Sequence, residues 1–508
     1  MASGGEGLTI GLDIGTSGAK GLLIDAAGAI VAEADAAYPL LTPRPGWTEQ
    51  QPEDWWQAAI AILRKLAAAA PSPPLAVGLT GQMHGATFLD ADAMPIRPAP
   101  LWNDQRTAAE CEEITRRVGG DALRRITGNS ALTGFQAPKI LWLRRHEPAA
   151  YARIRQVLLP KDFVRLRLTG VAASDASDAS GTLLLDLASR DYSDDLLQAL
   201  EVPREWLPRV FEGPEVTGRL TAAAAAATGL PEGLPVVAGG GDNAAAAVGS
   251  GIVRGGTGLL SLGTSGVIFV HSDRPTVDPS GALNAFCHAV PGAYCLMGVV
   301  LSAGGALRWY RDVIGTEANG SDASSIDADH YDAIQRAAAA VPPGCDGLTF
   351  LPYLSGERTP HMDPEARAAW IGLTLAHGRG HLARAVLEGV ALALRQSIER
   401  IGALGIGLER LNAVGGGVRS DLWRGIIAAA LRLPLQRLAA DQGPAFGAAL
   451  LAAVGAGIHA DVRAAADAAA RPAGVPEQPD AALGEVYDRA AATFNRLYPA
   501  LRAVREAD

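Results

Sequence analysis

The sequence has few aromatic residues, few cysteines and no long apolar run free of charge. Aromatic residues make up 5% of the 508 residues, and no two of the four cysteines (Cys111, Cys287, Cys295 and Cys345) form a C-x-x-C pair. This spacing favours neither a zinc site nor a disulfide framework, so we expect reduced thiols. The segment after Met1 has no basic region followed by an apolar run. We therefore predict neither a signal peptide nor a membrane span.

An excess of positive charge is also lacking. Lys and Arg number 44 against 54 Asp and Glu, which gives a formal net charge of −10. This negative net charge argues against general electrostatic binding of nucleic acid, although it permits a local cationic site for a phosphorylated ligand. We expect a cytoplasmic protein with neither nucleic acid nor a membrane as partner. Hydrophobic residues reach 48%, which suits a globular core, and the length predicts more than one domain.

What the sequence does contain is an internal repeat of a glycine-bounded turn. Gly15-Thr16-Ser17-Gly18 and Gly263-Thr264-Ser265-Gly266 have the same four residues in the same order. Each turn separates two apolar stretches, which are Leu8–Asp13 and Ala19–Asp25 in the first copy and Gly258–Leu262 and Val267–Val270 in the second. Both copies are therefore predicted to be β-hairpins. Their wide separation in the chain indicates two related domains.

Strand and helix patterns alternate after each hairpin. The first half continues with a strand at Ile30–Ala36, a helix from about Glu53 to Ala70 and a strand at Ala76–Thr80. The second half has a strand at Leu411–Val414 and a helix from about Asp421 to Leu431. This order predicts α/β domains. A glycine-rich stretch near 249–256 predicts the boundary, so we expect domains at 8–250 and 255–470 and a helical extension at 471–508.

The first turn has the residue types that bind phosphate. Backbone N–H groups of a glycine turn, together with the hydroxyls of Thr16 and Ser17, can cradle phosphate oxygens. One such turn is weak evidence, but two that face each other would hold one polyphosphate from both sides. Lys20 could reach a phosphate, or be an ordinary exposed strand lysine. Asp13 suits Mg²⁺ held through water, or a carboxylate that accepts hydrogen bonds from the turn.

A candidate general base follows a second glycine-rich segment. The residues from Val236 read as a strand, then a loop at Gly239-Gly240-Gly241, then a helix that begins at or near Asp242. The helix N-terminus stabilises an anionic carboxylate there, and a lone Asp would be read as a simple cap. Three glycines let another group approach closely, which makes Asp242 a candidate base for a hydroxyl. Gly415-Gly416-Gly417 similarly follows a strand and suits a flat ligand such as a nucleoside.

Two polar segments suit a sugar pocket. Met83-His84 follows a short strand, and Trp102 is followed by Asn103 and Asp104. Sugar hydroxyls pair with Asn, Asp and His, while sugar C–H faces pack on indole. The alternatives are a loop histidine bonded to backbone and ordinary core packing for Met83 and Trp102.

Together these segments resemble the FGGY family of carbohydrate kinases, from about Thr9 to Ala449. The motifs that carry the resemblance include Asp13-Ile14-Gly15-Thr16-Ser17-Gly18, Gly81-Gln82-Met83-His84-Gly85-Ala86, Leu101-Trp102-Asn103-Asp104, Leu159-Pro160-Lys161-Asp162, Ser174-Asp175-Ala176-Ser177-Asp178-Ala179-Ser180-Gly181-Thr182, Gly239-Gly240-Gly241-Asp242-Asn243-Ala244 and Leu351-Pro352-Tyr353-Leu354-Ser355-Gly356-Glu357-Arg358-Thr359-Pro360-His361. The resemblance implies an actin-like fold of two ribonuclease-H-like domains with the active site in the cleft between them. One departure is Gln136, where the family often has a small hydroxyl residue.

The resemblance also implies ATP-dependent phosphorylation of a sugar, with ATP and Mg²⁺ as cofactors. Asp242 would be the base, Asn243 would lie beside it in the sugar pocket, and Met83, His84, Trp102 and Asp104 would line that pocket. The residues that would face phosphates or Mg²⁺ are Asp13, Thr16, Ser17, Lys20 and Thr264, with Asp13 acting on the metal through water. The residues that would border the nucleotide are Gly304, Gly416, Gly417 and Ser420.

Within the family, the resemblance implies D-xylulose as the favoured substrate, in agreement with the Met83-His84 pair, and its phosphorylation would give D-xylulose 5-phosphate in pentose catabolism. A kinase for ribulose or ribitol, a non-catalytic sugar sensor and an actin-like filament ATPase remain alternatives. A sensor predicts damage at Asp13 or Asp242, and both are intact. A filament ATPase would not need the polar chemistry of Met83-His84. The expected partners are a small sugar and ATP, and a homodimer is left open.

Overall fold

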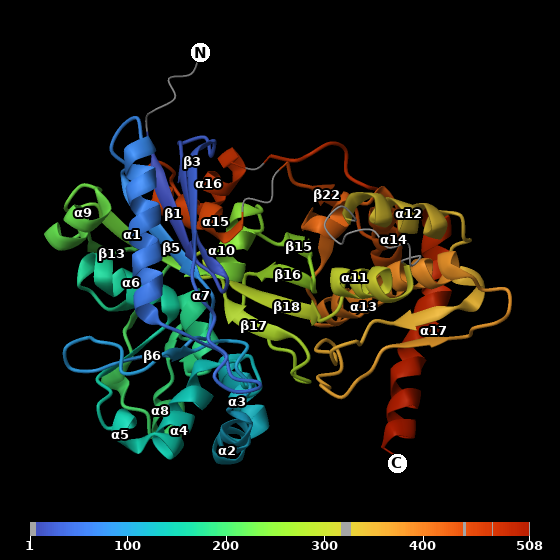
Figure 1. Cartoon of the computed structure of the whole chain (residues 1–508), viewed down its shortest axis with the longest axis horizontal. Helices are drawn as coiled ribbons and strands as arrows, with labels where there is room; N and C mark the ends of the chain where they lie inside the picture. Colours follow the sequence, from blue (N-terminus) through green and yellow to red (C-terminus); the bar gives the residue numbers. More distant parts are fainter. Residues whose placement is uncertain (1–6, 316–326, 440–442, 470, 507–508) are drawn as a thin grey trace. The chain divides into compact units, whose positions relative to one another are not determined.

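The computed structural model describes residues 7–315, 327–439, 443–469 and 471–506. The chain divides into two compact units (Figure 1). Unit 1 consists of Met1–Arg254, His271–Cys295 and Gln442–Ala470, and unit 2 consists of Gly255–Val270, Leu296–Asp441 and Arg471–Asp508. The expected domains were consecutive stretches of sequence, whereas compact packing returns two later stretches, 271–295 and 442–470, to the first unit.

Unit 1 is built on a six-stranded sheet with the order β13-β14-β5-β1-β2-β3. Its strands are β1 (Thr9–Ile14), β2 (Gly18–Ile24), β3 (Ile30–Ala37), β5 (Ala76–Gly81), β13 (Val216–Arg219) and β14 (Pro235–Gly241). The β1–β2 hairpin is antiparallel, and β5 pairs in parallel with both β1 and β14. The carboxyl ends of β1, β5 and β14 therefore lie at the same edge of the sheet.

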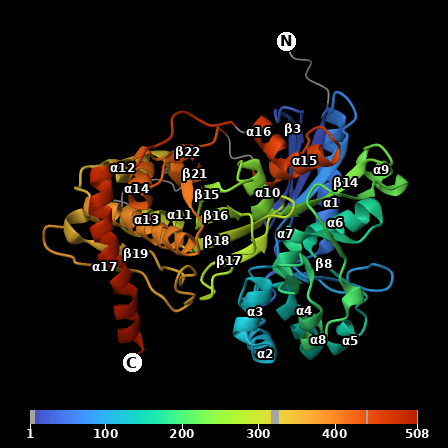
Figure 2. The same ribbon diagram turned by 180° about the vertical axis from the view of Figure 1, so that it is seen from behind.

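Helices cover both faces of this sheet (Figures 1 and 2). Helix α1 (Pro52–Ala69) buries Trp55, Ile62 and Leu66 in one core cluster with the apolar residues of β1. Helix α15 (Gly443–Gly455) covers the other face, where a Cβ added to Gly11 would lie 1.8 Å from the backbone oxygen of Ala445. This close backbone approach explains why the 442–470 stretch belongs to unit 1.

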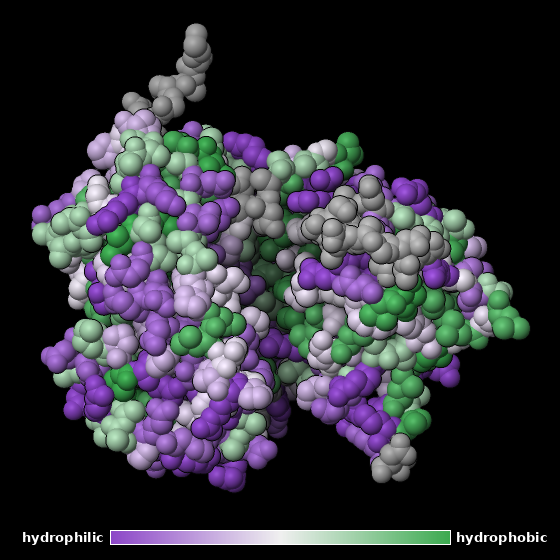
Figure 3. Space-filling model, in the orientation of Figure 1, coloured by the Kyte–Doolittle hydropathy of each residue, from purple (hydrophilic) through white to green (hydrophobic). Residues whose placement is uncertain are grey.

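The rest of unit 1 consists of short elements. The further helices are α2 (Ala108–Val118), α3 (Gly120–Thr127), α4 (Gln136–His146), α5 (Pro148–Tyr151), α6 (Pro160–Thr169), α7 (Ala176–Ala179), α8 (Asp194–Leu200), α9 (Ala222–Thr228), α10 (Asp242–Gly249) and α16 (Val462–Ala469). The further strands are β4 (Glu49–Gln50), β6 (Thr87–Leu89), β7 (Ala99–Pro100), β8 (Gln156–Leu158), β9 (Ala173–Asp175), β10 (Leu185–Asp186), β11 (Asp191–Tyr192) and β12 (Arg209–Phe211). The face of unit 1 seen in Figure 3 mixes hydrophilic and hydrophobic residues.

The second six-stranded sheet repeats the pairing of the first. Its order is β17-β18-β16-β15-β21-β22, and its strands are β15 (Gly256–Leu262), β16 (Gly266–Ser272), β17 (Asn284–Cys287), β18 (Tyr294–Val300), β21 (Leu408–Val414) and β22 (Leu435–Arg437). The β15–β16 hairpin is antiparallel, and β21 lies parallel to β15, as β5 lies parallel to β1. The predicted duplication of a hairpin-containing α/β fold is thereby confirmed.

Among its described residues, unit 2 also contains five α-helices and two short strands. They are α11 (Gly304–Tyr310), α12 (Asp327–Ala339), α13 (Arg379–Ala403), α14 (Asp421–Leu431), α17 (Ala481–Arg505), β19 (Thr349–Leu351) and β20 (Ala369–Ile371). The expected C-terminal helical extension corresponds to α17, which packs within unit 2. No helix among the described residues is long and apolar enough to cross a membrane, and all four cysteines are free and buried.

The strands and helices predicted within the two domains are found to within about three residues, apart from one segment. Gly239, Gly240 and Gly241 are not a loop but the last three residues of β14. The ladder with β5 shifts register between Val237 and Gly240, so two β14 residues lie opposite one β5 residue. Gly239 has a φ of +76°, and a Cβ there would lie 1.7 Å from the backbone oxygen of Leu79. Glycine is thus required for a bulge inside a strand, rather than for an open loop.

Candidate active site

The first glycine-bounded turn is held in place by two buried amide side chains. Gln82 donates to the backbone oxygen of Gly15 (3.1 Å), and Gln50 donates to that of Thr16 (2.7 Å). Gln82 also donates to the side-chain oxygen of Gln50 (2.8 Å). Both amides are buried. The turn therefore has a fixed shape, with its amide groups oriented by neutral side chains.

Three side chains predicted to face phosphate, in or next to this turn, differ in their exposure and contacts. Thr16 Oγ1 donates to Gln82 Oε1 (3.2 Å) and accepts from the indole N–H of Trp102 (2.9 Å). Ser17 is exposed. Lys20 is also exposed and pairs with Glu33 on β3 at 3.4 Å, so its visible role is that of a strand lysine. Only Thr16 has a defined position among the three.

Asp13, near the end of β1, has a carboxylate oxygen without a described hydrogen-bond donor. Its Oδ1 is buried and has no hydrogen-bond partner among the described residues. Burial, and to a lesser extent the charge of Asp242, raise the pKa of Asp13 to about 8, and Lys20 opposes this rise. A cation at this oxygen would restore the ionised form. The residue therefore fits a metal-facing role.

The Met83-His84-Gly85 segment is clamped by helix α4. Lys139 Nζ donates to the backbone oxygen of His84 (3.0 Å), and Gln136 Nε2 donates to that of Gly85 (3.0 Å). Gln136 also donates to the backbone oxygen of Leu158 (3.2 Å). The residue that departs from the family's pattern thus fixes the loop through two carbonyl groups. His84 itself has a φ of +71°, a backbone conformation that such clamping helps to maintain.

The side chains of this segment meet the neighbouring elements. His84 Nδ1 lies 2.7 Å from the backbone oxygen of Gly181, and its ring packs edge-on against Phe135. Met83 is buried, and a Cβ added to Gly241 would lie 2.9 Å from its Cγ. Met83 is therefore brought next to the residue that precedes Asp242, as a shared site requires.

Trp102 and Asp104 have different surroundings. Trp102 is 41% exposed while its indole N–H is bonded to Thr16, so the ring has a fixed position and is accessible from solvent. Asp104 is fully buried. Its carboxylate accepts from the Thr48 backbone N–H (2.7 Å) and twice from the Arg106 guanidinium (2.8 and 2.6 Å). Asp104 thus holds the loop that presents Trp102.

Asp242 is the first residue of α10, as predicted. Its Oδ1 accepts from the backbone N–H of Asn243 (2.7 Å) and from Asn243 Nδ2 (2.9 Å). Burial raises the pKa of Asp242 to about 6, and the two bonds from Asn243 oppose the rise. The result is a carboxylate that is ionised at neutral pH but more basic than an exposed aspartate. These are the properties of a general base.

In unit 2, the second turn is closely packed against the start of α11. Thr264 accepts backbone bonds from Ala303 and Gly305 (both 2.9 Å), and Gly263 accepts one from Gly304 (2.9 Å). A Cβ at Gly304 would lie 2.4 Å from the oxygen of Gly263, so only glycine fits. Three residues before α11, the backbone N–H of Leu301 donates to the buried carboxylate of Glu357 (2.9 Å), a residue of the quoted motifs to which the sequence assigned no role.

The segment Gly415-Gly416-Gly417 of unit 2 has open space beside one of its glycines. A Cβ at Gly416 would meet no atom within 4 Å, whereas one at Gly417 would meet Leu262 of β15 at 2.6 Å. Ser420 caps α14 by accepting from the Trp423 backbone N–H (3.1 Å) and donates to Gln335 (2.6 Å). Gly304 and Gly417 thus both border the end of β15 in the hairpin, Gly416 faces open space, and Ser420 follows as a helix cap.

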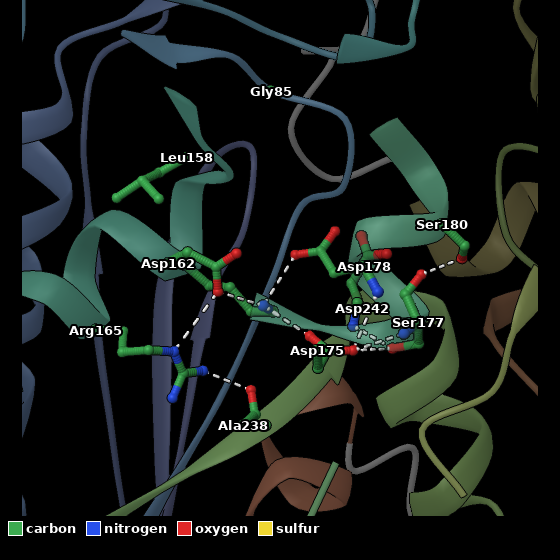
Figure 4. Close-up of polar contacts among 12 residues, drawn as sticks. Gly85, Leu158, Asp162, Arg165, Asp175, Ser177, Asp178, Ser180, Ala238 and Asp242 are labelled. Atoms are coloured by element: carbon green, nitrogen blue, oxygen red, sulfur yellow. Dashed lines mark hydrogen bonds and ion pairs between the residues drawn. The ribbon is translucent and has the colours of Figure 1, made fainter. Parts of the chain in front are cut away.

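A buried charge cluster beside Asp242 was not foreseen. Lys161, Arg165, Asp162, Asp175 and Asp178 are all at most 1% exposed. Figure 4 shows Asp175, Asp178 and Ser177 beside Asp242. Lys161, Asp162, Asp175 and Asp178 lie in the motifs that carry the family resemblance, but composition alone gives no signal that such charges are buried.

Comparison with known proteins identifies the relatives of this chain. Two family models match, those of the N-terminal and C-terminal domains of the FGGY family of carbohydrate kinases, over residues 8–249 and 258–456. The xylulose kinases of Escherichia coli K12 and Bacillus subtilis 168 are 45% and 38% identical, each over 88% of this chain and over 89% and 88% of their own. The structure of xylulose kinase from Rhodospirillum rubrum superposes with a TM-score of 0.91 and 36% identity, over 98% of this chain and 99% of that chain.

Proposed function

The chain belongs to the FGGY family of carbohydrate kinases, and we propose that it transfers the γ-phosphoryl group of ATP to D-xylulose, forming D-xylulose 5-phosphate. Membership makes it a sugar kinase with the two-domain α/β fold of that family. The observation that carries the specific proposal is the half-buried carboxylate of Asp242, next to the strand end that Met83 contacts. The similar xylulose kinases of Escherichia coli and Bacillus subtilis match over 89% and 88% of their own length, which supports this choice of sugar.

Phosphoryl transfer needs placement and charge neutralisation more than covalent help from the protein. We assign the sugar to unit 1, with Met83 and His84 at the ketose, Trp102 against its C–H face and Asn243 beside its hydroxyls. Asp242 orients the terminal hydroxyl and accepts its proton. Asp104 contributes by holding the Trp102 loop.

We assign the nucleotide to glycine-lined backbone in unit 2 and to the turn of unit 1. Gly416 leaves open space for a close approach, Gly304 and Gly417 pack closely against the hairpin that carries Thr264, and Ser420 lies at the following helix start. Thr16 and Ser17 add hydroxyls from unit 1, and Lys20 adds a charge if it leaves Glu33.

The surroundings of Asp13 are suited to binding Mg²⁺. No group of three or more His, Cys, Asp or Glu that could hold a metal occurs among the described residues, so a protein cage is absent from that part of the chain. Mg²⁺ keeps several waters and uses one or two carboxylates plus substrate phosphates, and the unpartnered oxygen of Asp13 matches that requirement. Bound there through water, the ion would neutralise charge on the phosphates.

A panel of acceptors tests the substrate. Initial rates of ADP formation with D-xylulose, D-ribulose, ribitol and no sugar should give the highest kcat/KM for D-xylulose. A higher value for D-ribulose or ribitol would change the assigned substrate, but the protein would still be assigned as a sugar kinase. Equal rates with and without every sugar would favour a filament ATPase, and no ADP at all would favour a sensor. A homodimer and a cytoplasmic location stay predictions.

The pH dependence of kcat/KM should report Asp242. The base acts ionised, and its pKa is raised to about 6, so at saturating Mg²⁺, where the cation keeps Asp13 ionised, activity should be constant above about pH 7. It should fall roughly tenfold per unit below pH 6, because the carboxylate becomes protonated there. Asn243→Ala removes one bond that lowers the pKa, so the falling limb should move to higher pH. A profile that stays flat to pH 5 would contradict this assignment.

Gly304→Ala should selectively weaken ATP binding. The added Cβ would lie 2.4 Å from the oxygen of Gly263, which forces the start of α11 away from the Gly263-Thr264 turn. The KM for ATP should rise at least about tenfold, since a displacement near 1 Å is enough for a large loss, while the KM for sugar changes little. Gly425→Ala is the matched control, because a Cβ on Gly425 in α14 meets nothing within 4 Å. Equal ATP KM values in the two variants would contradict the assignment.

A further inference from the structure

We propose that Ser177 is a positioning residue for Asp242, held in place by the buried charge cluster around Lys161. This inference rests on the proposed role of Asp242 as the base and extends it to residues that touch neither the sugar nor the nucleotide. It concerns the strand end from Ala238 to Gly241, which immediately precedes Asp242.

The strand end needs support because β14 leaves its regular ladder there. Two residues, Ala238 and Gly239, lie opposite the single residue Leu79 of β5. Glycines at 239, 240 and 241 have no side chain to pack, and a glycine-rich strand end loses much conformational entropy when it is ordered. The position of Asp242 therefore depends on contacts from outside the strand.

Arg165 supports the first half of this segment. Its guanidinium donates to the backbone oxygens of Val237 (2.7 Å) and Ala238 (2.5 Å) and to the hydroxyl of Thr217 (2.6 Å) on the neighbouring strand β13. Figure 4 shows Arg165 between Ala238 and Asp162. The guanidinium thus fixes the two carbonyl groups at which the register shifts.

Ser177 supports the second half. Its Oγ accepts from the backbone N–H of Gly241 (3.0 Å), the residue before Asp242. The same hydroxyl donates to Asp175 Oδ1 (2.5 Å), so its proton is directed away from Gly241 and its lone pair toward it. A hydroxyl that both donates and accepts in this way has one orientation only.

Asp175 is fixed by the lysine at the centre of the cluster. Its Oδ1 also accepts from the backbone N–H groups of Ser177 (2.9 Å) and Asp178 (3.0 Å), and its Oδ2 lies 2.7 Å from Lys161 Nζ. Lys161 further contacts Asp162 (2.6 Å) and Asp178 (3.2 Å), and Arg165 lies 3.6 Å from Asp162. One network of charges thus links both supports of the strand end.

The test is Ser177→Ala in two backgrounds. In the wild-type chain it should lower kcat about 10- to 100-fold, the loss expected from a displaced catalytic group, and leave the sugar KM within about threefold. In an Asp242→Asn background it should cost less than about twofold, because the group it positions is already gone. Such non-additivity distinguishes positioning from general damage, which would lower kcat equally in both backgrounds.

Ser180→Ala is the matched control. Ser180 is a buried serine of the same segment whose Oγ donates to Ser177 O (2.6 Å) and accepts from the Cys287 N–H (3.2 Å), without touching Gly241. It should retain kcat within about threefold. Equal losses in Ser177→Ala and Ser180→Ala, or an additive cycle, would overturn the inference.

This double-mutant cycle can be measured with any sugar that the wild type phosphorylates. The proposed substrate and the proposed role of Ser177 can therefore be refuted separately. A wild type that ignores D-xylulose but phosphorylates another panel sugar refutes the substrate alone. An Asp242→Asn variant with near-normal activity refutes the base and, with it, the positioning role. A severely impaired Asp242→Asn beside a normal Ser177→Ala refutes the positioning role alone.

Discussion

Asp242→Asn is expected to lower kcat by about 10²–10⁴-fold, the range typical for loss of a general base. Asparagine keeps the shape and can still accept from the Asn243 backbone N–H, but it cannot take a proton. The KM for the sugar should change little, because Met83, His84 and Trp102 are untouched. The measurement is steady-state ADP formation with D-xylulose at saturating ATP and Mg²⁺.

Asp194→Asn is the matched control for this substitution. Asp194 is likewise the first residue of its helix, α8, but it is exposed. It should retain activity within about twofold, so that loss of a helix-terminal charge is separated from loss of the base. An Asp242→Asn variant that turns over within a few-fold of wild type would contradict the assignment.

Lys161→Met should destabilise the protein by about 3–5 kcal/mol, because it leaves buried carboxylates without their cation. Lys161 Nζ lies within 3.2 Å of three aspartates that are all fully buried. Burial and the neighbouring carboxylates hold the pKa of Asp178 well above its usual range even with the lysine present. The measurement is the urea midpoint and slope of unfolding, followed by circular dichroism.

Lys139→Met provides the comparison. Lys139 is buried to the same degree, but it donates to the backbone oxygens of His84 and Gly134 and ion-pairs with no carboxylate that the structure describes. Burial lowers the pKa of Lys139 to about 7, and its removal leaves no buried carboxylate without a counter-ion, because its described partners are backbone carbonyls. The loss of unfolding free energy should stay within the roughly 1–3 kcal/mol of leaving buried hydrogen-bond acceptors unpaired, below the loss at Lys161. If Lys161→Met unfolds no more easily than Lys139→Met, the cluster does not have the stabilising role inferred for it.

Local patterns in the sequence predict much of the fold. The two hairpins, the helix beginning at Asp242 and the helix at Asp421–Leu431 follow from glycine-bounded turns and helix-start signals. What a local pattern cannot give is contact between distant segments. Helix α15 packs against unit 1 because glycines at 11 and 78 allow its backbone to come close. The sequence near 443–455 contains no signal that predicts this contact.

The site shows the same division. Residue type and spacing single out Asp242, Asp13 and Thr16 as chemically suited, and the structure gives each a definite environment. Their supports were not predicted, because a glutamine such as Gln82 or a lysine such as Lys161 reads as solvent-exposed until its burial is known. The glycines before Asp242 were interpreted as an open loop, since a bulge needs the partner strand to be recognised. The cleft expected between the two domains stays a prediction.

The most direct test of the account compares ADP formation with and without D-xylulose in wild type and Asp242→Asn. We predict that the sugar raises the wild-type rate at least about 100-fold above ATP hydrolysis alone, since water is a poor substitute for a positioned hydroxyl. In Asp242→Asn most of that rise should vanish. A wild-type rate that ignores D-xylulose and every related sugar would contradict the account.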